Sequence, residues 1–374
     1  MSESNARINV GIIGASPDRG WAATAHIPAL RALPQYRIAA LSTTRKESAL
    51  AASGKFGVPL SFDNHEALVT HPDVELVAVT VKVPQHRELV TAALRAGKHV
   101  YCEWPLGNGL AEAEQMAALA KQKGVHAAVG LQARFSPTMQ YVRRLVGDGY
   151  VGKVLSTTLI GSGMAWGGMG GAADAYVNDR HNGATMLTIP FGHTIDAVCL
   201  ALGEFQSLNA AMANNRTESI VMETKEKMAK TAEDQLSISG TLQSGATIAV
   251  HYRGGRSRGT NFLWEINGTE GDLQLSGPGG HAQFMEPVLR GAHRDDKALS
   301  DMPVPEEFRW VPASVPPGPA FNVAQSYARL FDDIRNSTSI VASFEHAVKR
   351  HRLLEAIENA AYTGQRQTLD MPAR

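Results

Sequence analysis

The chain has 374 residues, of which 44% are hydrophobic and 19% are charged, and its formal net charge at pH 7 is zero. This length favours two domains, and the composition is typical of a globular protein that can bury a core. A protein that wraps nucleic acid normally carries an excess of basic residues, so the zero net charge argues against nucleic-acid binding.

The first third of the chain alternates strand and helix patterns. Strands are predicted at 8–13, 36–42, 76–81, 99–102 and 126–131, and helices at 21–33, 87–96 and 110–123. The run 76–81 is continuously apolar, as expected for a strand buried on both faces of a parallel sheet. The alternation predicts an N-terminal α/β domain over residues 1–131, a Rossmann domain with a doubly wound parallel sheet.

The pattern changes near Gly149, and residues 132–374 are predicted to form a second, α+β domain. Strands that alternate apolar and polar residues are predicted at 236–242, 247–252, 262–266 and 273–275, with short turns between them. They predict an open, largely antiparallel sheet with one face solvated or covered by an interface. Residues 291–319 are predicted to be irregular, and helices follow at 323–335 and 345–362. The last helix is a candidate to pack back on the first domain.

Cysteine content and the N-terminus indicate the compartment. Two cysteines, Cys102 and Cys199, are too few for a disulfide framework or a structural zinc site, so both are expected to be reduced thiols. The first five residues are polar and acidic, whereas a signal peptide would be basic and then apolar. No apolar stretch approaches the ~20 residues that cross a bilayer. We therefore expect a cytoplasmic protein with no bound metal and no membrane partner.

The turn after the first strand is a degenerate dinucleotide-binding fingerprint. In that fingerprint, glycines allow backbone N–H groups to approach a pyrophosphate at the start of a helix. Gly14 matches the first glycine, Ser16 stands in place of the second, and Gly20 follows a lengthened loop that leads to Trp21. The alternative is an ordinary tight turn. Its position at the first strand-to-helix crossing favours a dinucleotide site.

The end of the second strand indicates which dinucleotide is bound. NAD-binding folds place a carboxylate there to bind the ribose 2′-hydroxyl. This chain has Ser42, Thr43 and Arg45 instead, and a guanidinium can pair with a 2′-phosphate. NADP is therefore the expected cofactor in preference to NAD. The alternative is that Arg45 is a solvated residue at the start of the next helix.

The segment 97–105 resembles the A-G-K-H-V-x-x-E-K-P signature of the glucose–fructose oxidoreductase and inositol dehydrogenase family. The segments 134–135, 152–154, 192–196, 262–275 and 344–364 resemble that family's domain junction, H-x-x-D segment, strand pair and closing helix, so the resemblance covers nearly the whole chain. It implies a nicotinamide cofactor, a carbohydrate-like substrate, and a dimer or tetramer formed through the C-terminal sheet. The other residues expected to bind the cofactor are Val81, His86, Glu103 and Trp104.

Two departures from the family pattern bear on catalysis. Trp104 replaces the family's catalytic lysine, and Ile189 replaces the carboxylate that stands four residues before His193. Both departures resemble the branch that contains the fungal galactose-pathway repressor, which binds a nicotinamide dinucleotide and acts through protein–protein contacts. Two functions therefore stay open: an NADP-dependent oxidoreductase, and a catalytically silent NADP-binding regulator with a protein partner.

Hydride transfer at a carbinol needs a group that exchanges the hydroxyl proton. His193 is the remaining candidate for this acid/base, with Asp196 one helical turn later as a group that could orient it, and with a pKa near 6.5 expected. Lys82, which follows a strand at the ligand-binding edge of the sheet, is a second catalytic candidate. The alternatives are a satisfied helix histidine and a solvated loop lysine. The residues expected to line the substrate site are Arg134, Trp166, Tyr176, Asp179, Asn182 and Asp196, of which Trp166 could equally anchor its loop.

Overall fold

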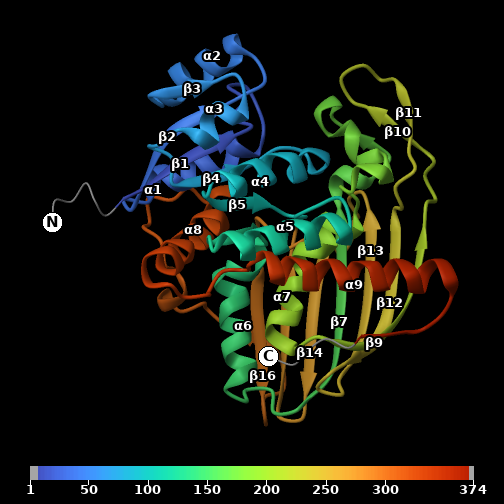
Figure 1. Ribbon diagram of the computed structural model, residues 1–374. Helices are drawn as coiled ribbons and strands as arrows, with labels where there is room; N and C mark the ends of the chain where they lie inside the picture. The colour runs from blue at the N-terminus through green and yellow to red at the C-terminus, as the bar shows by residue number, and fades with distance from the viewer. Residues whose placement is uncertain (1–6, 370–374) are drawn as a thin grey trace. The chain divides into compact units, whose positions relative to one another are not determined.

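The computed structural model describes residues 7–369, which form two compact units (Figure 1). The first unit combines the chain up to Gln132 with Arg309–Val348, and the second combines Ala133–Phe308 with the chain from Lys349 onward. The sequence places the first boundary at 131/132. It does not anticipate that a later segment, 309–348, belongs to the first unit, nor that the last helix is divided between the two.

The first unit is built on a six-stranded parallel sheet in the order β3-β2-β1-β4-β5-β6. Its strands are β1 (Ile8–Ile13), β2 (Tyr36–Ser42), β3 (Leu60–Phe62), β4 (Leu76–Val79), β5 (His99–Glu103) and β6 (Ala127–Gly130). The strand order reverses between β1 and β4, which is where ligands bind in doubly wound folds. The predicted Rossmann sheet is confirmed.

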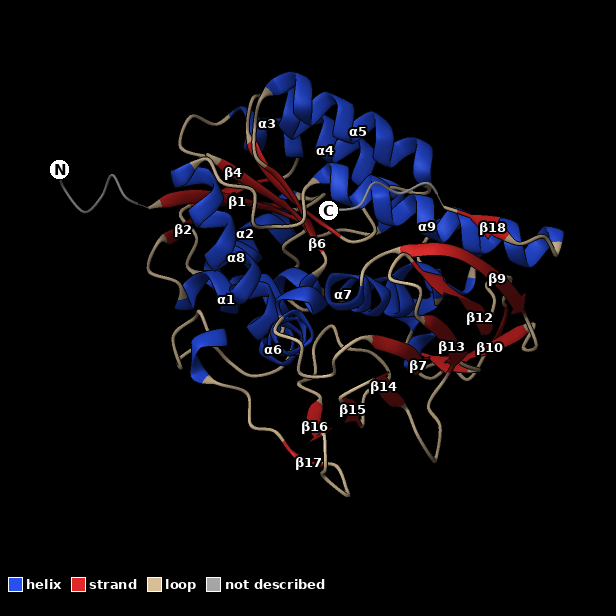
Figure 2. Ribbon diagram, turned by 90° about the horizontal axis from the view of Figure 1, so that it is seen from below, coloured by secondary structure: helices blue, strands red, loops and turns tan. Residues whose placement is uncertain are grey.

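Helices on the connections between strands, together with α8 from later in the chain, flank this sheet (Figure 2). They are η2 (Ala22–His26), α1 (Ile27–Ala32), α2 (Lys46–Phe56), α3 (His65–Thr70), η3 (Val83–Gln85), α4 (His86–Arg95), α5 (Leu110–Lys123) and α8 (Pro319–Asn336). The sequence pattern missed β3 and α3, because a three-residue strand and a six-residue helix are too short to show a periodicity.

The helix α8 joins the first unit because its apolar face completes that unit's core. Val323, Tyr327 and Leu330 are buried in the same cluster as the apolar side chains of β1 and α1. The Tyr36 hydroxyl also donates a hydrogen bond to the Tyr327 carbonyl at 2.8 Å. These contacts link segments almost 300 residues apart. A pattern read along the chain cannot detect them, so the assignment of this helix to the second domain differs from the structure.

The second unit is built on a nine-stranded sheet in the order β17-β16-β15-β14-β7-β13-β12-β9-β18. Its strands are β7 (Val154–Gly163), β9 (Phe205–Ala213), β12 (Gln235–Leu242), β13 (Thr247–Gly254), β14 (Phe262–Gly268), β15 (Gly271–Gly277), β16 (Val288–His293), β17 (Ser300–Asp301) and β18 (Gln367–Thr368). The one parallel pair is β7–β13. A small second sheet joins β8 (Met169–Gly170), β10 (Glu218–Val221) and β11 (Lys227–Ala229). The predicted open, largely antiparallel sheet is confirmed.

One face of the large sheet is covered within the second unit and the other is open. On β13, Ile248, Val250 and Tyr252 are buried, whereas Thr247 and His251 are exposed. The helices of this unit are η4 (Gln132–Phe135), α6 (Pro137–Gly147), η5 (Met164–Trp166), η6 (Ala172–Asn178), η7 (Arg180–Asn182), η8 (Leu187–Phe191), α7 (Gly192–Leu202), η9 (Glu306–Phe308) and most of α9 (Phe344–Thr363). The helix α7 lies against the covered face (Figures 1 and 2).

Two further observations concern the cysteines and the possible membrane spans. Cys102 and Cys199 are both buried and unpaired by a disulfide. Between residues 7 and 369 no helix is both long enough and apolar enough to cross a membrane.

Candidate functional site

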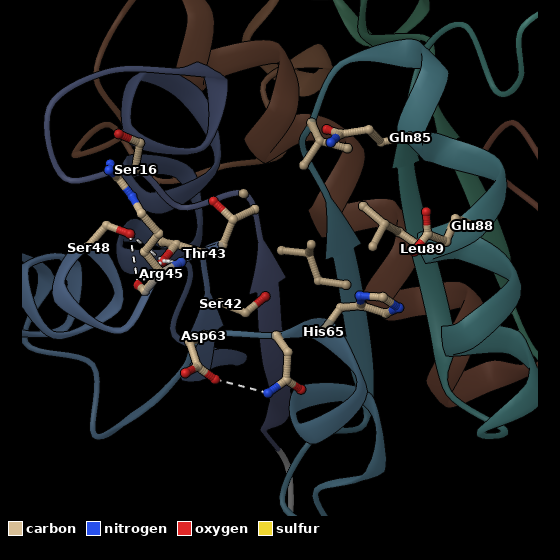
Figure 3. Close-up of a pocket in the computed structure, with 15 residues that line it drawn as sticks. Ser16, Ser42, Thr43, Arg45, Ser48, Asp63, His65, Gln85, Glu88 and Leu89 are labelled. Atoms are coloured by element: carbon tan, nitrogen blue, oxygen red, sulfur yellow. Dashed lines mark hydrogen bonds between the residues drawn. The ribbon is translucent and has the colours of Figure 1, made fainter.

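A cavity of about 440 Å³ lies at the carboxyl ends of the strands in the first unit (Figure 3). Its wall includes several residues that the sequence assigns to the cofactor: Gly14, Ser16, Ser42, Thr43, Arg45 and Val81. It also includes residues that the sequence missed, among them Ser48, Asp63, His65, Gln85 and Glu88. Asp63 and His65 were missed because they follow β3, a strand too short to be recognised. The Rossmann switch point is therefore a formed, concave site.

Gly14 is required by the backbone at this site. Its φ angle is +96°, and a Cβ atom added there would lie 2.7 Å from Cγ1 of Val81. The N–H groups of Gly14 and Ala15 donate to the Ser42 carbonyl at 3.0 and 3.3 Å, which ties the end of β1 to the end of β2. A side chain at position 14 would therefore collide with Thr80 and Val81, which follow β4. This is the fit expected for a dinucleotide held close to the backbone.

The end of β2 presents hydroxyl groups and a guanidinium to the cavity. The Arg45 carbonyl lies 2.9 Å from both the Thr43 and the Ser48 hydroxyls, and these two hydroxyls are 2.6 Å apart. Figure 3 shows Arg45 and Ser48 on one side of the cavity and Gln85 and Leu89 on the other. Asp63, after β3, and Glu88, in α4, contribute carboxylates to the wall, whereas the end of β2 has none.

Other expected cofactor residues lie in the first unit but are not in the wall of this cavity: Gly20, Trp21, His86, Glu103 and Trp104. The His86 ring is buried and bridges two carbonyls, that of Val81 at 3.0 Å and that of Pro105 at 2.9 Å. Trp21 packs against the apolar core of the unit, and the Trp104 side chain is only 3% exposed. Lys82 precedes η3 at the same strand edge and does not line the cavity either.

Glu103 is engaged inside the first unit. One of its carboxylate oxygens lies 2.8 Å from Nε2 of His26, and Gln132 donates to both oxygens at 2.7 and 2.8 Å. Nδ1 of His26 in turn lies 2.7 Å from the Tyr327 hydroxyl. This chain of buried hydrogen bonds joins β5, η2 and α8. Glu103 therefore has a structural role here, which the signature alone does not reveal.

His193 stands in the first turn of α7 and is only 1% exposed. Among the described residues, neither of its ring nitrogens has a hydrogen-bond partner. Burial, reinforced by the neighbouring His281, lowers the pKa of His193 to about 3. The imidazole is therefore neutral at neutral pH, with one donor and one acceptor available. The expected pKa near 6.5 is wrong, because the prediction took no account of desolvation.

Asp196 does not orient His193, which corrects the second half of that expectation. Its carboxylate lies 3.3 Å from Nη1 of Arg134 on one side and 3.3 Å from Nε of Arg350 on the other. The Asp196 side chain is completely buried. Arg134 and Asp196, both expected at the substrate site, thus form an ion pair with each other, and their contact with a substrate stays a prediction. The pairing was invisible to sequence analysis because Arg350 lies 154 positions away.

The remaining expected substrate residues form local structure in the second unit. Nε1 of Trp166 donates to the Ala184 carbonyl at 2.8 Å, which favours the loop-anchoring alternative. Asn182 donates to the Tyr176 carbonyl at 2.8 Å, and Asp179 is exposed and bound to His181. The structure therefore brings Tyr176, Asp179 and Asn182 together in the turns η6 and η7. Residues 7–369 contain no cluster of three or more His, Cys, Asp or Glu side chains that could hold a metal ion.

His281, in the loop between β15 and β16, was missed by sequence analysis. The next residue, Ala282, donates its N–H to the Thr194 hydroxyl at 3.4 Å, which places this loop against the first turn of α7. Burial lowers the pKa of His281 to about 4. Nothing in the sequence distinguishes this histidine from other loop histidines.

Two family descriptions match the chain. The oxidoreductase family with an NAD-binding Rossmann fold matches residues 8–131, and the Gal80p C-terminal domain matches residues 137–277. The chain is 31% identical to "Dehydrogenase aclE" of Aspergillus oryzae, over 96% of this chain and 97% of that protein. It is 27% identical to the galactose/lactose metabolism regulatory protein GAL80 of Saccharomyces cerevisiae, over 95% of this chain and 82% of that protein.

Solved structures agree with these matches. A super-repressor mutant of Gal80p from Saccharomyces cerevisiae superposes with a TM-score of 0.88 at 25% identity, covering 97% of this chain and 98% of that one. Levoglucosan dehydrogenase in complex with NADH and levoglucosan has the same fold, with a TM-score of 0.84 at 22% identity, covering 98% of this chain and all of the other. Dehydrogenases and a regulator thus share this architecture.

The buried histidines predict an acid-sensitive fold. Burial lowers the pKa of His193 to about 3 and that of His281 to about 4, whereas an unfolded histidine titrates near 6.5. Between these values the unfolded chain binds protons that the folded chain does not, so the free energy of unfolding falls as pH decreases from 6.5 to 4. Each group contributes up to about 1.4 kcal/mol per pH unit.

Urea unfolding at pH 7, 6 and 5 measures this dependence. His193→Gln should flatten the pH dependence by about one group's share, whereas His251→Gln, at an exposed position of β13, should leave it unchanged. Identical pH dependence in the wild type and His193→Gln would show that His193 binds protons equally in the folded and unfolded protein, so that burial does not lower its pKa.

Proposed function

Because the chain belongs to the family of NAD-binding oxidoreductases that includes glucose–fructose oxidoreductase and inositol dehydrogenase, we propose that it is an NADP-dependent oxidoreductase of a sugar or polyol-like substrate. The observation that carries the proposal is His193, a buried imidazole whose two nitrogens have no partner among the described residues. Buried polar groups are almost always hydrogen-bonded, and exceptions concentrate at functional sites. Dehydrogenases among the relatives support the reaction class.

The proposed reaction needs a hydride carrier and a group that exchanges a proton. A nicotinamide group, when bound, supplies the hydride acceptor or donor. In our proposal a neutral His193 accepts the hydroxyl proton as the carbinol is oxidised and returns it in the reverse direction. Lys82 is a second candidate for an ammonium at the strand edge, since Trp104 has no titratable group. We retain Tyr176, Asp179 and Asn182 as substrate contacts, and assign Arg134 and Asp196 to positioning α7.

NADP(H) is expected to bind more tightly than NAD(H). The end of β2 has hydroxyls and Arg45 in place of a carboxylate, and a charge-assisted contact between Arg45 and a 2′-phosphate is worth ~1.5–3 kcal/mol, about tenfold or more in affinity. Titration calorimetry with both cofactors on the wild type and Arg45→Ala measures this difference, and the variant should lose most of it. Arg37→Ala, on the exposed surface of β2, is the control. Equal wild-type affinities for the two cofactors would refute the preference.

His193→Ala is expected to reduce turnover by ~10²–10⁴ with NADP affinity nearly unchanged. Because its pKa is about 3, His193 stays deprotonated above pH 5, so its contribution to alcohol oxidation should be constant from pH 5 to 8 and decline only toward pH 3. Steady-state rates across this range measure it. His351→Ala removes an equally buried histidine on α9 and should retain turnover. A wild-type rate that rises through pH 6.5 and loses that rise in His193→Ala would contradict the neutral base.

A homo-oligomer, a dimer or a tetramer, is expected through the open face of the large sheet. That face presents Ile160, Leu263 and Val288 among small polar side chains, and pairing with a second copy would bury them. Light scattering at micromolar concentration should show at least a dimer. Val288→Lys, whose wild-type side chain is 52% exposed, should weaken association, whereas Leu50→Lys, an exposed position in the first unit, should not. A monomeric wild type would refute the predicted homo-oligomer.

A catalytically silent regulator is the second candidate, and Trp104 is the observation that favours it. The side chain stands where the family signature has its lysine, and the GAL80 protein shares this architecture. A substrate screen that follows the absorbance of the reduced cofactor, with sugars, polyols and imines, separates the two candidates. Turnover by the wild type supports the enzyme. No turnover, weak activity restored by Trp104→Lys, and a bound protein partner would support the regulator.

A further inference from the structure

The loop between β15 and β16 is fixed against the first turn of α7. The N–H of Ala282 donates to the Thr194 hydroxyl at 3.4 Å, and that hydroxyl donates to the Pro190 carbonyl at 3.0 Å. The Gly280 carbonyl accepts the Ser162 N–H at 2.8 Å, and a Cβ added at Gly280 would lie 1.9 Å from the Ser162 carbonyl oxygen. The loop is therefore hydrogen-bonded to both β7 and α7, and these contacts fix the position of His281.

His281 resembles His193 in its surroundings. It is 7% exposed, and its Nδ1 has no hydrogen-bond partner among the described residues. Its ring packs edge-on against Phe284 with the centroids 4.7 Å apart, which restricts its orientation. His281 is close enough to His193 to help lower the pKa of the His193 imidazole. Both ring nitrogens of His193 and Nδ1 of His281 are buried without a hydrogen-bond partner among the described residues, and the hydrogen bond from Ala282 to Thr194 holds their two segments together.

We propose that His281 is a second substrate-contacting residue, which forms with His193 a paired-imidazole site for a neutral hydroxyl group of the substrate. This inference rests on the proposed oxidoreductase function and extends it to a residue and a selectivity. A neutral imidazole offers one donor and one acceptor, whereas a hydroxyl offers one donor and two acceptor lone pairs, so one imidazole can accept the hydroxyl's hydrogen while the other donates to its oxygen.

The same site disfavours an anionic substrate group. A carboxylate offers only acceptors, so it would leave the imidazole acceptor nitrogens unpaired and would be buried without a cation. The guanidinium groups of Arg134 and Arg350, which reach α7 one turn later, are already paired with Asp196. The site is therefore expected to select a hydroxymethyl or secondary hydroxyl over a carboxylate at the same position of a sugar.

A matched pair of sugars tests this selectivity without requiring turnover. With histidine ring nitrogens labelled with ¹⁵N and NADPH present, D-galactose and levoglucosan should shift the signals of both His193 and His281, identified by His193→Gln and His281→Gln. D-Galacturonate, which carries a carboxylate in place of the hydroxymethyl group, should shift neither signal at the same concentration. If no neutral sugar shifts the His281 signal, as when a water molecule alone occupies the site, the proposal is overturned. Equal shifts with D-galacturonate also overturn it.

Kinetics separate this inference from the proposed function. With the sugar that the wild type turns over fastest, His281→Gln should raise KM about three- to tenfold, the loss of one hydrogen bond, and change kcat less. His351→Gln, an equally buried histidine on α9, should change neither constant. Turnover with an unchanged KM in His281→Gln would refute the inference and leave the oxidoreductase standing. Sugar-induced shifts of the His193 and His281 ¹⁵N signals without any turnover would support the paired-imidazole site and refute the proposed oxidoreductase function.

Discussion

The position of α7 depends on a buried ion network around Arg350. This guanidinium is completely buried, and it donates to both carboxylate oxygens of Glu204 at 3.0 Å and to Asp196 at 3.3 Å. Although burial opposes ionisation, Arg350 lowers the pKa of Glu204 to about 2. Asp196 binds Arg134 as well, so α7 is held by charges on both sides. Removing one partner from such a network typically costs ~3–5 kcal/mol, because the other charge stays buried.

A neutral His193 lies one turn before this network. Asp196 is ion-paired with Arg134 and Arg350 and accepts no hydrogen bond from the imidazole. Burial and the neighbouring His281 lower the pKa of His193, and neither of its ring nitrogens has a hydrogen-bond partner among the described residues. A helix fixed by ion pairs at one turn can thus hold an unsatisfied polar group at the previous turn, where a partner from outside the chain would satisfy it. The residue that fixes α7, Asp196, and the residue that we propose as the acid/base, His193, are therefore different residues of the same helix.

In the first unit, too, different residues form the cavity and the structure that supports it. Gly14 and the end of β2 shape the cofactor cavity, whereas Glu103, His26 and Tyr327 form a buried hydrogen-bonded chain that supports β5. The family signature at 97–105 contains Glu103 but neither Gly14 nor the end of β2, so it includes part of the supporting chain and none of the cavity wall. A cavity of this kind is compatible with an enzyme and with a regulator, since binding a dinucleotide needs no catalytic group. The difference between the two functions therefore lies in the second unit and at Trp104.

The sequence by itself determined the elements whose patterns are local. Five of the six strands of the parallel sheet, the long helix α5 and the turn at Gly14 follow from periodicity and from the φ angle that glycine allows. It also revealed the missing carboxylate after β2. Only the tertiary structure decided that α8 completes the first unit, that Asp63 and His65 line the cavity, and that Asp196 pairs with Arg350. The physical reason is that burial and charge pairing depend on atoms from distant segments. For that reason the neutral state of His193 and the position of His281 could not be predicted from residue types along the chain.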